Sequence, residues 1–489
     1  MHLTNNSTHK LMRPSPFEQF DSCRLLTALI NMSRSPSSSF HLVDISLLIS
    51  KPMAAINTAS PVRSSGDSLF EENNDRRFSF LSANPSQKIR FRNAREIDDW
   101  KKTLQSPSLI QTDANNSDIP FHSGWMGYFS YPKSHIDRGI MAEFNYYPWS
   151  ICFDQLRGRF HLLGKPDQAA KDAYFWLVSH FSETNKSNHN SGQQPNSVGA
   201  KEKEYTAYLT PFKAASFKAR WRKEDYQKAF TNVQNYLLAG DCYQVNLTHP
   251  FISAHYKGSA VSTLQPLFDA LKPSFGCYFQ GEHCELVSMS PERFISIDHT
   301  GKIEAKPIKG TIKRSLDSVR DDQLIAELKN SAKNKAENLM IVDLLRNDLS
   351  ISAIPGSVNV DKLFELESHP NVHHLVSTIS AQLKPDISPA EAISNAFPGG
   401  SITGAPKKRA MEIIEELEVQ PRSLYCGSFG YFSDTGNADF NILIRSLEFR
   451  DNTITCWGGG GITVDSNGDE EYEESLTKIQ RIMDVIEGL

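Results

Sequence analysis

The sequence has few cysteines for its length, seven in 489 residues. None of them shows the CxxC spacing of a zinc site, and an odd number scattered along the chain argues against a disulfide framework. This usage fits a reducing compartment, so we expect a cytoplasmic protein. The seven are Cys23, Cys152, Cys242, Cys277, Cys284, Cys426 and Cys456.

The sequence also lacks long apolar runs and an excess of charge of one sign. The apolar segments RLLTALINM and LVDISLLIS, near the N-terminus, are far shorter than the ~20 residues of a membrane-spanning helix, and we read neither as a targeting signal. The 52 Lys and Arg residues against 57 Asp and Glu residues give a net charge of −5, without the basic excess of a nucleic-acid-binding protein. A soluble globular enzyme with no nucleic-acid or membrane partner is the expected class.

The chain divides into stretches of different composition. Residues 1–40 are rich in Ser, Asn and Pro and predict a poorly ordered N-terminal extension. Residues 41–180 alternate strand-like runs with turn residues and predict a mostly β region with helices. Residues 182–204 have almost no apolar side chain and predict a disordered linker or loop. Residues 220–489 are the second predicted folded region and hold most of the motifs below.

Helical and strand patterns occur without βαβ regularity, which predicts an α+β fold. A helical pattern runs through Leu238 to Gly240 and is followed by a strand. Apolar residues recur every three or four positions from Asp321 to Leu349, which predicts one long helix. A last helix is predicted from Glu470 to the C-terminus.

The segment KPIKGTIKR, residues 306–314, places Lys309 between a β-branched residue and a glycine. A strand that ends sharply at Gly310 can aim the side chain that precedes the glycine. An ordinary basic strand and turn would have the same composition, so the local features leave both interpretations open.

The last predicted helix carries carboxylates and a cation on one stripe. Glu471, Glu474 and Lys478 follow one another at spacings of three and four residues. Such a stripe by itself is more often a solvated face with an ion pair. A third carboxylate, Glu337, lies in the apolar run AENLMIVDLL, where it is costly unless it is paired or bound to a metal. Hard oxygen ligands without His or Cys suit Mg²⁺, so magnesium is the predicted cofactor.

Other segments have both a structural and a functional interpretation. Gly458–Gly461 permit either an anion-binding backbone or the close approach of a neighbouring backbone. Arg445 is either an exposed cation or a residue that binds a carboxylate with two hydrogen bonds. Ser401 is either a helix cap or a substrate contact. Of the adjacent His373 and His374, one side chain is expected to face inward and the other outward.

Taken in order, a series of motifs resembles the chorismate-utilising enzymes. They are SMSPERF, KPIKGT, AENLMIVDLLRND, HHLVSTISAQL, FPGGSITGAPK, YCGSFGYFS, and GGGGITVDS followed by EYEES. The resemblance is dense over residues 225–489 and thinner before them, where IPFHSGWMGYFSY carries it. It implies a large two-sheet β-sandwich-like core with helices packed outside, which is the anthranilate synthase component I type of fold.

Within this family, PIKGT is similar to the branch that aminates chorismate. The resemblance implies that Lys309 attacks the chorismate ring and expels its hydroxyl, and that ammonia then displaces the lysine to give 4-amino-4-deoxychorismate. The attack requires an unprotonated amine, so the pKa of Lys309 has to be lowered from about 10.4 by burial and by cations such as Lys306 and Lys313. Glu292 matches the family's general acid, which requires a raised pKa.

Two alternative activities stay open. The branch that forms anthranilate shares most of the motifs but typically has alanine where Lys309 stands. A non-catalytic, tryptophan-binding homologue is the other alternative, and the intact predicted catalytic and metal-binding residues weigh against it. Gln244 stands where the water-using relatives have a lysine as general base. An amide cannot act as that base, so ammonia is favoured over water.

The resemblance also implies individual ligands. The implied substrate contacts are Arg445, Tyr425, Gly459, Lys478, Ser401, His374, Gly310, Thr311 and Gln244. The implied magnesium ligands are Glu337, Glu471 and Glu474, and Asn334 replaces an acidic residue that is frequent in relatives. A tryptophan pocket is implied at Ser50, Pro273, Ser274 and Phe275.

Ammonia requires a source. The sequence shows no cysteine in the Gly-flanked turn that a glutamine amidotransferase uses as nucleophile. The resemblance therefore implies a separate glutaminase subunit in a heterodimer, and a product that serves 4-aminobenzoate and folate biosynthesis.

Overall fold

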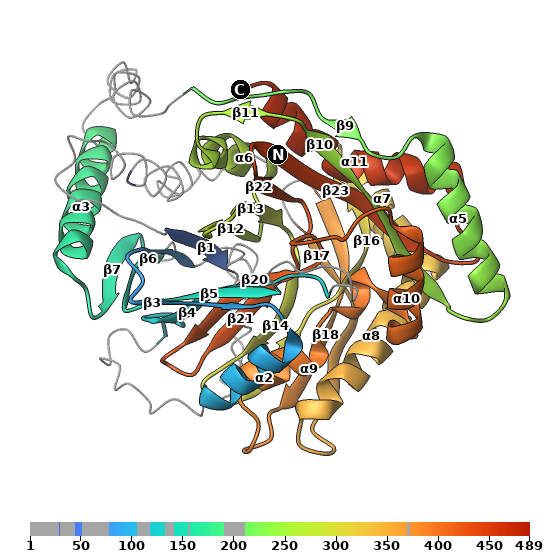
Figure 1. The fold of residues 1–489 in the computed structure, drawn as a ribbon, viewed down its shortest axis with the longest axis horizontal. Coiled ribbons are helices and arrows are strands. Elements are labelled where there is room, and N and C mark those ends of the chain that lie inside the picture. Colours follow the sequence, from blue (N-terminus) through green and yellow to red (C-terminus); the bar gives the residue numbers. More distant parts are fainter. Residues whose placement is uncertain are drawn as a thin grey trace, which may run out of the picture.

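The structure is a computed structural model that describes residues 29, 45–50, 78–104, 118–132, 141–154, 157–189, 211–368 and 372–489. Its described residues form two large antiparallel sheets with helices on their outer faces (Figure 1). This confirms the predicted α+β class and the two-sheet core. None of the helices in these ranges combines the length and hydropathy that crossing a membrane requires.

The first sheet contains strands from both predicted folded regions. In spatial order it comprises β19 (Gly404–Ala405), β10 (Gln244–Ser253), β23 (Thr453–Ile462), β22 (Ser446–Arg450), β13 (Glu285–Ser290), β12 (Phe275–Gln280), β1 (Ser46–Ser50), β2 (Phe78–Ser82), β6 (Trp149–Asp154) and β7 (Arg159–Gly164), with β9 (Lys218–Ala219) paired to β10. A short ribbon joins β8 (Lys213–Ala214) to β11 (Tyr256–Lys257).

The second sheet also mixes the two regions. Its order is β16 (Ile308–Lys313), β18 (Val372–Gln382), β15 (Lys302–Ala305), β14 (Arg293–Ile297), β21 (Ala438–Asn441), β20 (Ser428–Ser433), β4 (Gly124–Phe129), β5 (Ala142–Tyr147) and β3 (Gln87–Phe91), with β17 (Asn359–Ser368) on the free side of β18. Each sheet thus spans both predicted regions, whose strands adjoin at β12–β1 in the first sheet and at β20–β4 in the second.

Apolar side chains from both sheets meet in a common core. Phe80 and Cys277 of the first sheet pack with Met126, Phe429 and Tyr431 of the second. Their burial removes a large apolar area from water, which is the main favourable term in folding. The sandwich is thereby fixed as one unit that holds segments far apart in the sequence.

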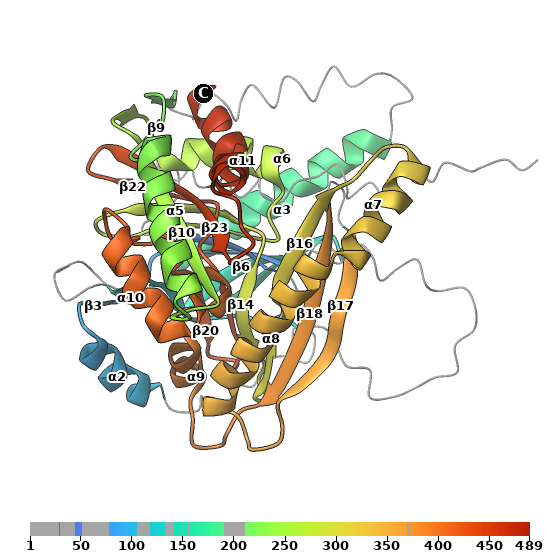
Figure 2. The ribbon, with the colours of Figure 1, turned by 90° about the vertical axis from the view of Figure 1, so that its right-hand side faces the viewer.

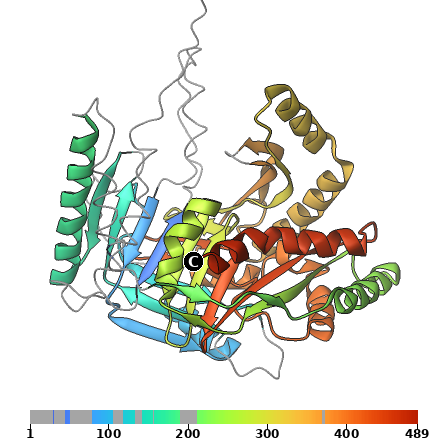
Figure 3. The ribbon, with the colours of Figure 1, turned by 90° about the horizontal axis from the view of Figure 1, so that it is seen from above.

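Helices cover the outer faces of both sheets. The first sheet packs against α3 (Gln168–His189), α6 (Leu264–Leu271) and α11 (Gly468–Glu487), while α5 (Lys223–Leu238) and α10 (Lys407–Leu417) cover β10. The second sheet packs against α2 (Ala94–Thr103), α8 (Ala332–Ser352) and α9 (Pro389–Ala396). Figure 2 shows α7 (Ser318–Asn330) and α8 along β16–β18, on the side opposite α5, α10 and α11. From above, α7 and α8 stand out on the side away from α3 (Figure 3).

Several helices follow the sequence pattern closely. In α5 the buried residues Tyr226, Ala229, Val233 and Leu237 recur every three or four positions, as an amphipathic helix requires. After α5 the chain turns at Gly240, which has a φ of +80°. This confirms the predicted helix and the strand that follows it, and α11 confirms the last predicted helix.

Three expectations are corrected by the structure. The predicted helix Asp321–Leu349 is two helices, because the Ser331 side chain accepts from the Asn334 amide and starts α8 anew. Residues 182–189, predicted to begin a disordered loop, continue helix α3. The other residues of that loop lie outside the described ranges, as does the predicted N-terminal extension apart from Leu29.

The third correction concerns the paired histidines, since both His373 and His374 are buried. His373 lies 3.2 Å from the Asp321 carboxylate on α7, and His374 bonds to Thr311 of β16. Each ring therefore has a neighbour in the fold, Asp321 of α7 for His373 and Thr311 of β16 for His374, and neither ring is exposed to solvent.

Strand β16 contains a bulge between Ile308 and Thr311, the stretch that carries Lys309. Ile308 pairs with Val376 and Thr311 pairs with His374, so three steps along β16 match two along β18. Gly310 takes a φ of +85°, which L-residues rarely adopt. A Cβ at this position would lie 3.0 Å from both Leu328 and Asn334. The glycine thus permits the bulge and the close approach of α7 and α8.

We expect Gly310→Ala to destabilise the fold more than Gly356→Ala. Gly356 has a similar φ of +81°, but a Cβ there meets nothing within 4 Å. The control should lose about 1 kcal/mol from left-handed backbone strain, and Gly310→Ala at least about 1 kcal/mol more from overpacking. Urea unfolding of both variants measures the difference, and equal losses would contradict the assigned contact.

Candidate active site

Lys309 projects from the bulge of β16 and is partly buried. Burial of its amine is the main cause that lowers the pKa of Lys309, and Lys478 contributes in the same direction. The carboxylates Glu292 and Glu337 oppose the shift. Lys306 was predicted to be one of the cations that lower this pKa. Its Nζ instead forms an ion pair with Glu367 Oε1, at 3.5 Å. The effective cation is thus Lys478, contributed by a distant helix.

Glu292 lies between β13 and β14 and is 8% exposed. Its backbone amide donates to Ser290 Oγ, and its Oε1 accepts from Ser401 Oγ at 3.1 Å. Burial raises the pKa of the Glu292 carboxyl, while Lys309 and the Ser401 hydrogen bond act against the rise. Ser401 is therefore a direct partner of the predicted acid and does not serve as a helix cap.

Lys309 and Glu292 shift in opposite directions for one physical reason. Removal from water disfavours the charged form of each, which is the ammonium of the lysine and the carboxylate of the glutamate. Burial therefore moves both groups towards their uncharged forms, a free amine and a protonated carboxyl. Such a pair can supply a nucleophile and an acid to the same substrate.

Two cations, Lys478 and Arg445, act on the Glu292 carboxyl. Lys478 Nζ donates to the Gly459 carbonyl at 3.1 Å and lies 2.7 Å from Glu474. Burial lowers the pKa of Arg445, with Glu292 as its opposing charge. Arg445 has a φ of +53°, a strained conformation of the kind found at functional sites. Two cations held this way can receive the carboxylates of a dianionic substrate.

Tyr425, another predicted substrate contact, is 8% exposed. Its ring stacks on Trp457 with centroids 5.6 Å apart and an interplanar angle of 6°. The stack fixes Tyr425 next to the glycine-rich end of β23.

The glycine-rich strand serves close packing. A Cβ at Gly458 would lie 2.4 Å from the Ser475 carbonyl of α11, and one at Gly459 would lie 2.4 Å from the Leu247 carbonyl of β10. At Gly460 the added atom would lie 3.1 Å from Glu471 and 3.3 Å from Lys478. Of the two interpretations of this run, the structure supports the close approach of backbones, with Gly460 facing predicted ligands.

Gln244, at the start of β10, is fully buried, and neither of its amide atoms has a hydrogen-bond partner among the described residues. A Cβ at Gly461 would lie 2.9 Å from Gln244 Nε2, so the amide faces the glycine-rich strand. A buried orphan amide is costly unless a ligand or water satisfies it. This agrees with its predicted place among the substrate contacts.

Thr311 and His374 belong to neighbouring strands and bond to each other, with Thr311 Oγ1 2.8 Å from His374 Nδ1. His374 is 8% exposed. The bond fixes the histidine ring beside the bulge that carries Lys309.

The three predicted magnesium ligands come from two helices, Glu337 from α8 and Glu471 and Glu474 from α11. No group of three acidic, His or Cys side chains in the described ranges has metal-binding geometry. Glu471 is buried and accepts from Ser466 Oγ at 2.7 Å; burial raises its pKa, and repulsion from Glu474 adds to the rise. A cation would relieve that repulsion, and these hard oxygen donors suit Mg²⁺.

Lysines partly neutralise this acidic pair in the structure. Although burial opposes the charge of Glu474, Lys478, Lys333 and Lys309 hold its pKa below the ordinary value. Lys333 was not found from the sequence. It was missed because it comes near α11 only when α8 is folded beside that helix.

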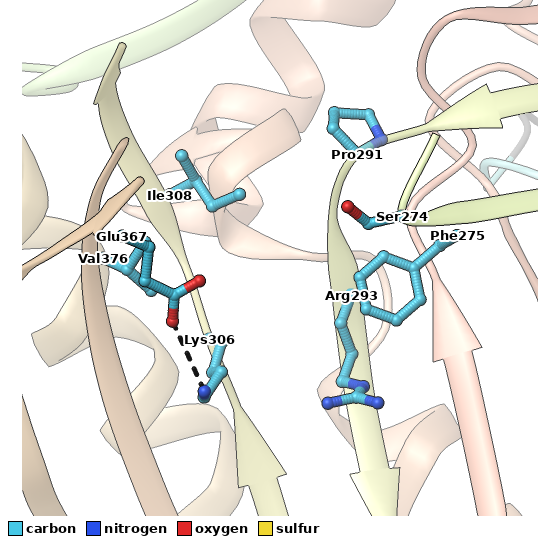
Figure 4. Close-up of a pocket in the computed structure, with 8 residues that line it drawn as sticks. All are labelled: Ser274, Phe275, Pro291, Arg293, Lys306, Ile308, Glu367 and Val376. Carbon is cyan, nitrogen blue, oxygen red and sulfur yellow. Dashed lines mark hydrogen bonds and ion pairs between the residues drawn. The ribbon is translucent and has the colours of Figure 1, made fainter. Parts of the chain in front are cut away.

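Two of the predicted tryptophan-binding residues line a pocket beside β14 and β16 (Figure 4). Ser274 and Phe275 form one wall, and the Lys306–Glu367 ion pair lies on the opposite wall. The cavity volume is about 20 Å³, which is room for a water-sized molecule and not for an indole. Pro273 is buried beside them, and Ser50 ends β1, which pairs with β12. Tryptophan binding stays a prediction.

Comparison with known proteins places these features in a family. The model of the chorismate binding enzymes matches residues 66–484. Aminodeoxychorismate synthase component 1 of Escherichia coli K12 is 40% identical over 385 residues, which are 76% of this chain and 79% of that protein.

Solved structures show the same fold. Anthranilate synthase component I from Streptococcus pneumoniae superimposes with a TM-score of 0.66 and 22% identity, covering 88% of this chain and 95% of that one. The menaquinone-specific isochorismate synthase of Escherichia coli gives a TM-score of 0.60 and 16% identity, over 95% and 100% of the two chains.

We expect Lys309→Met to stabilise the protein at pH 7 by on the order of 1 kcal/mol, as functional residues often cost stability. The folded pKa of Lys309 lies below its ordinary value of 10.5, so the unfolded chain binds more protons. The lysine therefore destabilises the fold at pH 7, and the gain from methionine should fade as the pH approaches 10.5.

Chemical unfolding at pH 7 and pH 10 measures this effect. Lys306→Met is the matched control on the same segment, and it should be neutral or lose up to about 1 kcal/mol because it breaks a partly exposed ion pair. A loss of stability for Lys309→Met at pH 7 would contradict the assigned cost of burial.

Proposed function

The chain belongs to the family of chorismate binding enzymes, and we propose that it is component 1 of an aminodeoxychorismate synthase that aminates chorismate to 4-amino-4-deoxychorismate. The family and fold predicted from the motifs are thereby confirmed. The observation that carries the proposed reaction is the juxtaposition of Lys309, with a lowered pKa, and Glu292, with a raised one.

In the first step, the neutral amine of Lys309 forms a carbon–nitrogen bond with the chorismate ring. The ring hydroxyl leaves with its bonding electrons and takes the proton of Glu292, so that water departs. The adduct nitrogen then loses a proton to the Glu292 carboxylate, which restores the acid. Ser401 holds the Glu292 carboxyl in place, and the Arg445 and Lys478 cations bind the carboxylates of the substrate.

In the second step, ammonia forms a bond to the carbon that the hydroxyl left, and the bond between the ring and Lys309 breaks. The lysine nitrogen leaves with the bonding electrons and takes up a proton, while the new ammonium group loses one. Gln244 cannot accept a proton from water as a lysine could, which favours ammonia in this step. Its buried amide has no hydrogen-bond partner among the described residues.

Magnesium is part of the proposal. Glu337, Glu471 and Glu474 would hold the ion, which supplies positive charge for a substrate carboxylate when bound. The replacement of an acidic residue by Asn334 leaves this side of the site with less negative charge. Asn334 packs against the Gly310 bulge instead.

The source of ammonia is also proposed. The name component 1 of the Escherichia coli relative implies a second component, and we assign that role to a separate glutaminase subunit in a heterodimer. A cytoplasmic location is proposed from the cysteines, which are few and scattered in the sequence; all six in the described ranges are buried. The product would feed 4-aminobenzoate and folate synthesis.

The alternative activity is that of anthranilate synthase component I. It is less well supported, because the branch that forms anthranilate typically has alanine where Lys309 stands. That reaction therefore needs no lysine nucleophile. The fold itself does not discriminate, since the Streptococcus pneumoniae structure shares it.

We expect chorismate alone, without ammonia, to add to Lys309 a mass equal to chorismate less one water. Mass spectrometry of the intact protein and of its peptides measures the adduct. Lys309→Ala should abolish it, whereas Lys313→Ala, an exposed position on the same strand, should retain it. Ammonium should then release 4-amino-4-deoxychorismate, and release of anthranilate instead would refute the proposed function.

We expect Glu471→Gln and Glu474→Gln to weaken Mg²⁺ binding at least about tenfold, since each removes a charged oxygen ligand. Calorimetric titration with MgCl₂ measures the affinity. Glu470→Gln, an exposed neighbour on the same helix, is the control and should bind as the unsubstituted protein does. An equal loss in the control would argue against the assigned ligands.

A further inference from the structure

Arg422 lies between α10 and β20, three residues before Tyr425, and is 2% exposed. A buried guanidinium is costly unless its donors are used. Burial opposes the charge of Arg422, but Glu418 keeps its pKa well above the ordinary value. The residue is therefore a permanently charged group in the interior, and the proposed reaction gives it no chemical role.

The guanidinium of Arg422 joins three segments of the chain. Its Nε and Nη2 donate to both carboxylate oxygens of Glu418, at 2.9 and 2.7 Å. Nη1 donates to the Ile402 carbonyl at 2.8 Å, and Nη2 to the Asn246 carbonyl at 2.6 Å. The guanidinium also lies 4.6 Å from the centroid of the Tyr131 ring.

One branch of this network leads to the catalytic acid. Ile402 follows Ser401 in a single turn of 3₁₀ helix, Gly400–Ile402, and Ser401 holds Glu292. The Ile402 carbonyl receives a second bond from Asn246 Nδ2 at 3.0 Å. The turn that presents the Ser401 hydroxyl is thus held by two donors, one of which is the charged Arg422.

A second branch leads to the substrate-binding strand. Glu418 Oε1 accepts from the backbone amide of Thr248 at 3.0 Å and from its hydroxyl at 2.8 Å. Thr248 pairs with Gly459 in the first sheet, and the Gly459 carbonyl accepts from Lys478. The Arg422–Glu418 pair therefore sets the position of strands β10 and β23 at the site.

We propose that Arg422 is a positioning residue for this reaction, which uses its fork of donors to hold the Ser401 turn against Glu292 and, through Glu418, the β10–β23 strand pair. The inference rests on the proposed function. Arginine suits the role because its planar fork reaches two carbonyls and a carboxylate at once, whereas a lysine amine occupies one point.

The test measures the rate at which Lys309 forms its adduct at saturating chorismate, for Arg422→Lys, Ser401→Ala and the double variant. Each single substitution should slow adduct formation. If Arg422 acts through Ser401, its effect should shrink in the Ser401→Ala background, with a coupling of at least about fivefold. Glu418→Gln provides a second substitution in the same network if Arg422→Lys does not fold.

Lys407→Met is the matched control, because it breaks another buried ion pair, with Asp348, at the opposite end of α10. It should lower the unfolding midpoint but leave the rate of adduct formation near that of the unsubstituted protein. Effects of Arg422→Lys and Ser401→Ala that multiply independently, or a rate for Arg422→Lys no lower than that of the control, would overturn the positioning role.

The unsubstituted protein distinguishes a failure of the proposed function from a failure of the inference about Arg422. If it forms no adduct at all, the proposed function fails. If it forms the adduct and the double variant shows no coupling, the function stands and the inference about Arg422 fails.

Discussion

Desolvation of Lys309 and Glu292 is the constraint on which the rest of the site depends. In water the amine would be protonated and the carboxyl ionised, and neither could begin the proposed chemistry. Removal from water shifts each group towards its uncharged form, and Lys478 adds to the shift of Lys309. A site of this kind needs a large, well-packed protein around it, which a sandwich of two sheets supplies.

Burial has to be combined with an accurate placement of groups that are remote in sequence. The bulge at Gly310 aims Lys309, the turn at Ser401 holds Glu292, and α11 brings Lys478 to the Gly459 carbonyl. Each of these comes from a different element, and they meet because the two sheets and the helices packed on them bring distant segments together. The buried ion pair of Arg422 and Glu418 lies between such elements, and the Arg422 guanidinium donates to the backbone carbonyls of two of them.

Much of the fold and of the candidate site could be predicted from local patterns and motifs in the sequence. Helical spacing located α5 and α11, and the motif around Lys309 indicated this residue as the candidate nucleophile. The break at Ser331 was missed, because a capping serine inside a helical pattern changes no periodicity. The partner of Lys306 was missed for another reason, since Glu367 lies 61 residues further along the chain and meets it only across the sheet.

The sequence by itself determined which residue types are available for the chemistry and their order along the chain, because motifs are properties of short segments. It left open whether Gly458–Gly461 admit an anion or a backbone, and which cation lowers the pKa of Lys309. The tertiary structure decided both, in favour of close backbone packing and of Lys478. The physical reason is that desolvation and electrostatic coupling depend on distances between segments far apart in sequence, and folding alone sets those distances.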